Sequence, residues 1–160
     1  MSKVIVISSD AMVGEDLDYF QTLPNFKKYL GGGARITHVS SIYPTVTFPA
    51  HVSMMTGMYP DRHGVFSNMQ LIPGSDPTPW QWNYDFIHCE DIFRAAKKKG
   101  KTTAAVFWPV TAYNPAIDYH IADNWANLRA MLILPPLLNV WVPMSRFSIL
   151  FIKMSISSLV

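Results

Sequence analysis

Short apolar runs alternate with helix-like segments along the first 125 or so residues of the chain. The runs Lys3–Ser9 and 102–108 are rich in β-branched and apolar residues, which predicts two buried parallel strands. Between them, the polar and apolar alternation of 34–40 predicts a third strand. Helices are predicted over 24–30, 47–57 and 88–99, each bounded by proline, threonine or aspartate at its start and glycine at its end. Strands and helices in this alternation predict an α/β fold with a mostly parallel sheet.

Between the predicted elements, residues 59–64 predict a turn, and 70–86, rich in proline and aromatic residues, predict an irregular surface segment. The last part of the chain breaks the alternation of strands and helices. Residues 128–160 are apolar, yet prolines at 135, 136 and 143 disfavour a central strand or a continuous helix. We therefore divide the chain into 1–127 and an apolar tail, 128–160, that we expect to be irregular or non-native.

The distribution of charged residues supports the same division of the chain. All eleven acidic residues lie at or before Asp123, whereas the tail carries three basic residues and no aspartate, glutamate or histidine. A reading-frame change or truncation near Asn127 explains such a shift, and a membrane-associating tail is the alternative. The apolar runs of the tail are shorter than the roughly 20 residues of a spanning helix, and Lys3–Ser9 is too short for the core of a signal peptide. We therefore expect a cytoplasmic location and no membrane partner.

The overall composition excludes several classes of protein. The net charge is +2 over 160 residues, which argues against a nucleic-acid polymer as the partner. A single cysteine excludes an intrachain disulfide framework and a cysteine-rich zinc site. The five histidines form neither a helical i, i+4 pair nor an HExxH motif, although each could ligate a metal by itself.

Two residues stand where an α/β fold places chemistry. Asp10 follows the first strand, and the carboxyl ends of strands are the edge at which ligands bind. Its carboxylate could hold a metal, or it could cap the following turn. Thr47 begins a predicted helix, whose free N–H groups favour phosphoryl groups. Its hydroxyl could be a nucleophile if a metal lowers its pKa, or it could be an ordinary N-cap.

Other candidates are ambiguous when taken one at a time. Asn68 ends a turn-rich stretch and by itself is typical of a turn. Trp80, Trp82 and Tyr84 could stack on a base or sugar, or could cover the edge of a core. No GxGxxG or GxxxxGK[ST] phosphate loop is present.

Four segments together resemble a known family. VIVISSDAM, LPNFKKYLGGGA, SIYPTVTFPAHVSMMTGMYPDRHGVFSN and KTTAAVFWPVTA occur in the order found in type I phosphodiesterase/nucleotide pyrophosphatases, members of the alkaline phosphatase superfamily. The resemblance runs from about Lys3 to about Trp125. It implies part of an alkaline-phosphatase-like sandwich with a mostly parallel sheet and, in the full-length family, two divalent metal ions, with zinc the expected metal. It also implies hydrolysis of phosphodiester or pyrophosphate bonds in nucleotide-type or other small phosphate-ester substrates.

The resemblance assigns roles to four residues. Asp10 matches a metal ligand, and Thr47 matches the nucleophile, also a metal ligand, that forms a covalent phosphothreonine. Asn68 matches a donor to a phosphoryl oxygen, and the backbone N–H of Phe48 would be a second donor. The remaining metal ligands of the family lie downstream of the matched segment, so the site would be incomplete here. A catalytically inactive fragment is therefore the alternative to an enzyme, followed by a membrane-associated module.

Overall fold

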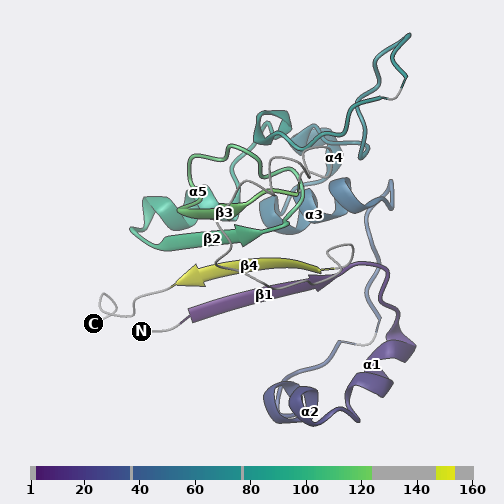
Figure 1. The fold of residues 1–160 in the computed structure, drawn as a ribbon, viewed down its shortest axis with the longest axis vertical. Coiled ribbons are helices and arrows are strands. Elements are labelled where there is room, and N and C mark those ends of the chain that lie inside the picture. Colours follow the sequence, from purple (N-terminus) through teal and green to yellow (C-terminus); the bar gives the residue numbers. More distant parts are fainter. Residues whose placement is uncertain (1–2, 37, 77, 124–146, 154–160) are drawn as a thin grey trace, which may run out of the picture.

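The computed structural model describes residues 3–36, 38–76, 78–123 and 147–153, which form a mixed sheet flanked by helices (Figure 1). The strands are β1 (Lys3–Ser9), β2 (Thr102–Val106), β3 (Tyr119–Ile121) and β4 (Phe147–Lys153), in the order β1-β4-β2-β3. β4 is antiparallel to both of its neighbours, whereas β2 and β3 are parallel. β1, β2 and β3 therefore run in one direction, and the predicted α/β class is confirmed, with β2 and β3 as the parallel pair in a mixed sheet.

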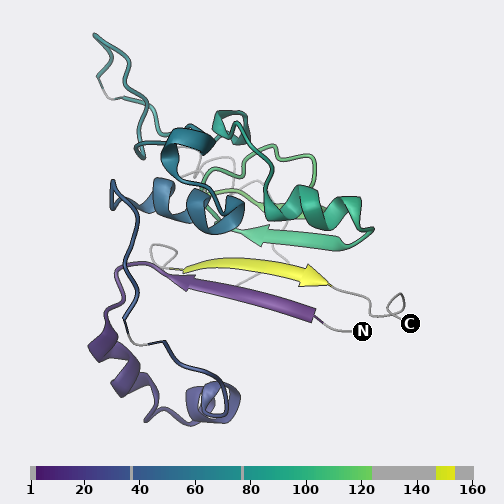
Figure 2. The same cartoon turned by 180° about the vertical axis from the view of Figure 1, so that it is seen from behind.

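The helices divide into two groups. They are α1 (Gly14–Phe20), α2 (Pro24–Leu30), α3 (Thr47–Thr56), α4 (Pro60–His63) and α5 (Ile92–Lys98), with one 3-10 turn at Tyr84–Phe86. α3, α4 and α5 lie on the side of β2 and β3, whereas α1 and α2 lie beyond β1 (Figures 1 and 2). No helix of the described residues is long and apolar enough to cross a membrane.

Local sequence signals explain where the helices begin and end. Pro24 is the first residue of α2, where its missing N–H costs nothing. Gly57 ends α3 in the left-handed conformation, at φ 68°. α5 is shorter than predicted because Asp91 is its N-cap: the carboxylate accepts hydrogen bonds from the N–H groups of Phe93 and Arg94.

The strand predicted over 34–40 does not form. The described residues of this segment are an extended link between α2 and α3, in which Ile36 and Val39 are exposed. Alternation makes a stable strand only where a neighbouring strand and a core are available, and this segment pairs with no other described strand. One contact that holds this segment is an ion pair at 2.9 Å between Arg35 and Asp18 of α1.

Two further expectations change. β1 is not buried: it lies at the edge of the sheet, and its Val4, Ile5 and Ile7 are 40%, 55% and 64% exposed. The tail is not irregular throughout, because β4 comes from it and lies between β1 and β2. The other residues of the tail lie outside the described ranges.

The hydrophobic core lies between the sheet and the helices α3 and α5. α3 buries Phe48, Val52 and Met55, and α5 buries Phe93 against Ala105 of β2 and other apolar residues. At about 1.5–3 kcal/mol for each large side chain removed from water, this cluster dominates the stability of the described fold. β1 contributes Val6, which is partly buried, to this cluster.

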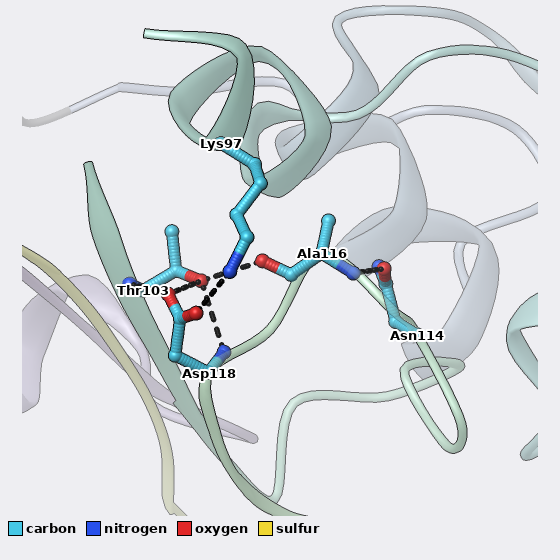
Figure 3. A network of polar contacts seen from close by, with 5 residues as sticks. All are labelled: Lys97, Thr103, Asn114, Ala116 and Asp118. Carbon is cyan, nitrogen blue, oxygen red and sulfur yellow. Dashed lines mark hydrogen bonds and ion pairs between the residues drawn. The ribbon is translucent and has the colours of Figure 1, made fainter. Parts of the chain in front are cut away.

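Polar contacts fasten α5 to β2 and to the segment before β3 (Figure 3). The Lys97 ammonium of α5 contacts the Asp118 carboxylate, which also accepts the N–H of Thr103 at 2.8 Å. The Thr103 hydroxyl donates to the carbonyl of Ala116 at 2.7 Å, and the Ala116 N–H donates to the Asn114 side chain. Hydrogen bonding from Lys97, followed by that from Thr103, lowers the pKa of Asp118. This network lies at the amino end of β2, opposite the edge of the sheet to which Asp10 belongs.

Candidate active site

Asp10 and Thr47 meet at the carboxyl end of β1. The Thr47 hydroxyl donates to Asp10 Oδ2 over 3.3 Å, although the residues are 37 positions apart. The other carboxylate oxygen of Asp10 accepts the N–H of Ala11 at 3.0 Å. Asp10 therefore caps the turn after β1 and also contacts Thr47, whereas its role as a metal ligand stays a prediction.

Thr47 is the first residue of α3 rather than its N-cap. Val46 occupies the N-cap position, and its side chain makes no capping hydrogen bond. The N-cap interpretation of Thr47 is therefore wrong: its hydroxyl caps no amide of α3 and instead donates to Asp10. Since Asp10 is exposed and Thr47 is half-buried, the pair is open to solvent.

Phe48 and Asn68 form a second contact beside the first. The backbone N–H of Phe48 donates to Asn68 Oδ1 at 2.8 Å, which fixes the orientation of the amide because an N–H can only donate. The backbone carbonyl of Asn68 accepts the N–H of Gln81, which holds Asn68 on its other side. The Phe48 ring is 1% exposed and lies edge-to-face with Trp80 at 5.3 Å. The structure therefore brings all four predicted site residues to the start of α3.

His51 connects β1 to the first turn of α3 through its two ring nitrogens. Its Nδ1 lies 2.8 Å from the carbonyl oxygen of Thr47, and its Nε2 lies 2.9 Å from the Ser8 hydroxyl of β1. The ring packs edge-to-face with Trp108, which follows β2, at 5.2 Å. Burial lowers the pKa of His51, which favours the neutral imidazole.

The other buried or half-buried histidines have structural partners. His63 contacts the Ser53 hydroxyl at 2.9 Å and accepts the N–H of Val65, joining α4 to α3. His120 contacts the Thr111 hydroxyl at 2.9 Å. Within the described ranges, no three or more histidine, cysteine, aspartate or glutamate residues lie close enough together to hold a metal ion.

The aromatic residues of the irregular segment cover the core. Trp82 packs against the core cluster, and Tyr84 is 4% exposed within it. Trp80 is 38% exposed and borders the Phe48 ring. The core-edge interpretation therefore holds for Trp82 and Tyr84, whereas Trp80 lies next to the candidate site.

Sequence reasoning missed Ser8, His51 and Trp108. Each has a common structural interpretation, and nothing in their spacing links residues 8, 51 and 108. A weak signal does exist: Ser8 stands two residues before Asp10, and His51 stands four residues after Thr47 on the same helix.

Comparison with known proteins points to the same family as the sequence resemblance. A family model described as type I phosphodiesterase / nucleotide pyrophosphatase matches residues 4–146. Ectonucleotide pyrophosphatase/phosphodiesterase family member 3 of Rattus norvegicus is 29% identical over 119 residues, which are 66% of this chain and 13% of that protein. Family member 1 of Homo sapiens is 32% identical over 92 residues, 54% of this chain and 10% of that protein.

A further relative has a more specific name. A bis(5'-adenosyl)-triphosphatase of Mus musculus is 26% identical over 118 residues, which are 68% of this chain and 25% of that protein. This chain thus spans a quarter or less of the length of these relatives. Because the family match covers most of the 160 residues, the chain belongs to the type I phosphodiesterase / nucleotide pyrophosphatase family.

Proposed function

We propose that this chain carries the nucleophile part of a site that hydrolyses phosphodiester or pyrophosphate bonds in small nucleotide-type substrates. The observation that carries the proposal is the contact between the Thr47 hydroxyl and Asp10 at the carboxyl edge of the sheet. The names of the relatives, nucleotide pyrophosphatase/phosphodiesterase and bis(5'-adenosyl)-triphosphatase, support phosphoric anhydrides and diesters as the substrate class.

In this proposal, Thr47 is the nucleophile. Its Oγ1 forms a bond to phosphorus as the bond from phosphorus to the leaving oxygen breaks, and the leaving group gains a proton as the hydroxyl loses one. Water then cleaves the phosphothreonine and restores the hydroxyl. Asp10 Oδ2 orients the hydroxyl before attack, and α3, ten residues long, directs the positive end of its dipole at the phosphoryl group.

Asn68 is the proposed phosphoryl ligand. Because its Oδ1 is occupied by the Phe48 N–H, its Nδ2 is the atom that can donate to a phosphoryl oxygen. The Phe48 N–H then acts mainly by holding the Asn68 amide in this orientation. This refines the expectation that both groups donate directly to the substrate.

The proposal includes divalent metal ions, with zinc the expected metal, because the family resemblance implies them. Asp10 and Thr47 are oxygen donors on one open edge and could contribute to one metal ion, which would make the Thr47 hydroxyl a stronger nucleophile. Two ligands do not complete a four-coordinate zinc site, and the described residues hold no cluster of three or more ligands. The described residues alone therefore do not fit the complete two-metal centre.

The test is hydrolysis of an aryl phosphodiester by the purified chain with and without added zinc. Thr47→Ala should abolish turnover, whereas Thr45→Ala should leave it unchanged. Thr45 is a matched control because it is exposed and its hydroxyl donates only to the nearby carbonyl of Ile42. Turnover that survives Thr47→Ala would reject Thr47 as the nucleophile, and no turnover above background would reject catalysis by this chain.

A second candidate is a non-catalytic portion of such an enzyme. The exposed Val4, Ile5 and Ile7 of β1 favour it, since a strand with this composition is usually covered by further protein. It predicts weak zinc binding and a broad melting transition. A single cooperative transition together with two tightly bound zinc ions per chain would contradict it.

A further inference from the structure

Two polar connections join β1 to the first turn of α3. One is the contact between Asp10 and the Thr47 hydroxyl. The other passes through His51, which contacts Ser8 of β1 with one ring nitrogen and the Thr47 carbonyl with the other, at 2.9 and 2.8 Å. The same threonine is thus held by its hydroxyl and by its backbone, both times from the end of β1.

The position of the His51 ring is tightly defined. His51 is 5% exposed, and Trp108, which packs against it, is 2% exposed. The ring therefore touches three elements at once: β1 through Ser8, α3 through Thr47, and the segment after β2 through Trp108. A buried ring with both nitrogens bonded has little freedom to turn.

We infer that His51 is a positioning residue, which holds the backbone of Thr47 at a fixed distance from the end of β1 and so keeps the Thr47 hydroxyl beside Asp10. This inference rests on the proposed role of Thr47 as the nucleophile. His51 itself does not reach the hydroxyl: in the described structure it acts on the carbonyl of Thr47.

The geometry dictates the protonation pattern of the ring. The Thr47 carbonyl can only accept, so His51 Nδ1 carries the hydrogen, and Nε2 accepts from the Ser8 hydroxyl. His63 shows the opposite pattern. Its Nδ1 accepts the N–H of Val65, so its Nε2 carries the hydrogen and donates to Ser53. The chain therefore contains an internal reference for each tautomer.

The first experiment is nitrogen NMR of the full chain labelled with ¹⁵N-histidine, at one neutral pH. We expect His51 to show a protonated Nδ1 and an unprotonated Nε2, and His63 to show the reverse. Assignment follows from the single variants His51→Asn and His63→Asn. A His51 ring protonated at Nε2 alone would overturn the inference, because Nδ1 would then have no hydrogen to donate to the Thr47 carbonyl.

The second experiment uses a matched pair of serine variants. Ser8→Ala removes the donor to His51, and Ser53→Ala removes the corresponding partner of His63, at the same distance of 2.9 Å. Ser8→Ala should shift the amide and methyl signals of Thr47, whereas Ser53→Ala should leave them in place. Unchanged Thr47 signals in a folded Ser8→Ala chain would overturn the inference. If Ser8→Ala does not fold, the tautomer of the unsubstituted chain decides.

Turnover separates this inference from the proposed function. Where the chain is active, Ser8→Ala should lower kcat on the order of 10- to 100-fold with little change in KM, since displacement of a nucleophile by about 1 Å has such an effect. His51→Asn, which retains a side-chain N–H near the Thr47 carbonyl, should keep more activity than His51→Ala. Equal losses in both would count against positioning. A chain without turnover refutes the proposed function, while the NMR results still decide whether His51 holds Thr47.

Discussion

Asn68 supplies two different polar atoms at the start of α3, and two substitutions separate their effects. Its Oδ1 accepts the N–H of Phe48 at 2.8 Å, which is a structural contact. Its Nδ2 is the proposed donor to the phosphoryl oxygen. Asn68→Ala removes both atoms, whereas Asn68→Asp keeps an oxygen acceptor for the Phe48 N–H and removes the donor.

The two effects differ in size and in the quantity that reveals them. Asn68→Ala leaves the amide of Phe48, a residue only 1% exposed, without its acceptor, which costs about 1–3 kcal/mol of unfolding free energy. This lowers Tm by on the order of 5 °C. Asn68→Asp should stay within about 0.5 kcal/mol of the unsubstituted chain, because a carboxylate is favoured at a helix amino terminus. Both variants should lose about 10²–10³ in kcat, the usual effect of removing one such donor.

The assays are thermal unfolding followed by circular dichroism and hydrolysis of an aryl phosphodiester. Ser67→Ala is the control, since Ser67 is exposed and its hydroxyl contacts only the nearby Met69 N–H. If Asn68→Asp loses as much stability as Asn68→Ala, then Oδ1 is not the structural acceptor. If an active chain keeps its kcat in Asn68→Asp, then Nδ2 is not a phosphoryl ligand.

Three further predictions concern the scaffold. Gly64→Ala should lower the urea midpoint more than Gly74→Ala: both have positive φ, but only at Gly64 would the new Cβ meet a side chain, 2.6 Å from His88 Nδ1. Equal losses would exclude that contact as the cause. Asp91→Ala should destabilise the chain by about 1–2 kcal/mol in denaturant titrations, since two amides of α5 lose their cap, and an unchanged midpoint would contradict this. Burial lowers the pKa of His63, whose two nitrogens are both bonded. The unfolded chain therefore binds a proton that the folded chain excludes, so stability is greatest above about pH 6.5 and falls as the pH drops below it. A Tm that stays constant from about pH 8 to about pH 5.5 would contradict this prediction.

Features encoded by neighbouring residues were predictable from the sequence. The start of α2 at Pro24 and the end of α3 at Gly57 each depend on a few adjacent residues. The existence of α5 is predicted in the same way, although its predicted start is residue 88 and the structure places its N-cap at Asp91. Features that depend on distant partners were not predictable. The segment 34–40 alternates like a strand but has no described strand beside it, and β4 lies between β1 and β2 although it comes last in the chain. Its apolar composition permits a strand, but its place in the sheet depends on the two strands that it joins.

The candidate site likewise contains residues that local sequence patterns predict and one whose role depends on a distant partner. The position of Asp10 after a strand and of Thr47 at the start of a helix follows from local patterns, and parallel strands bring such positions to one edge. The family motif added Asn68. The structure adds that its Oδ1 accepts the Phe48 N–H, which leaves Nδ2 as the proposed donor. His51 could not be recognised from sequence, because its role depends on Ser8, 43 positions away. A lone histidine gives no indication of its hydrogen-bond partners until the chain is folded.

The two halves of the candidate site are held by different forces. α3 is anchored by buried side chains, among them Phe48 and Val52, so the position of Thr47 follows from the packing of the core. β1 has mostly exposed side chains, and among the described residues its contact with the core is the partly buried Val6. The position of Asp10 therefore depends on backbone pairing with β4 and on hydrogen bonds to α3. Since each such bond contributes only about 1 kcal/mol, removing one should change the distance between Asp10 and Thr47 before it unfolds the core. For this reason, substitutions at the end of β1 should reduce the activity of an active chain more than its stability, whereas substitutions in the buried face of α3 should reduce both.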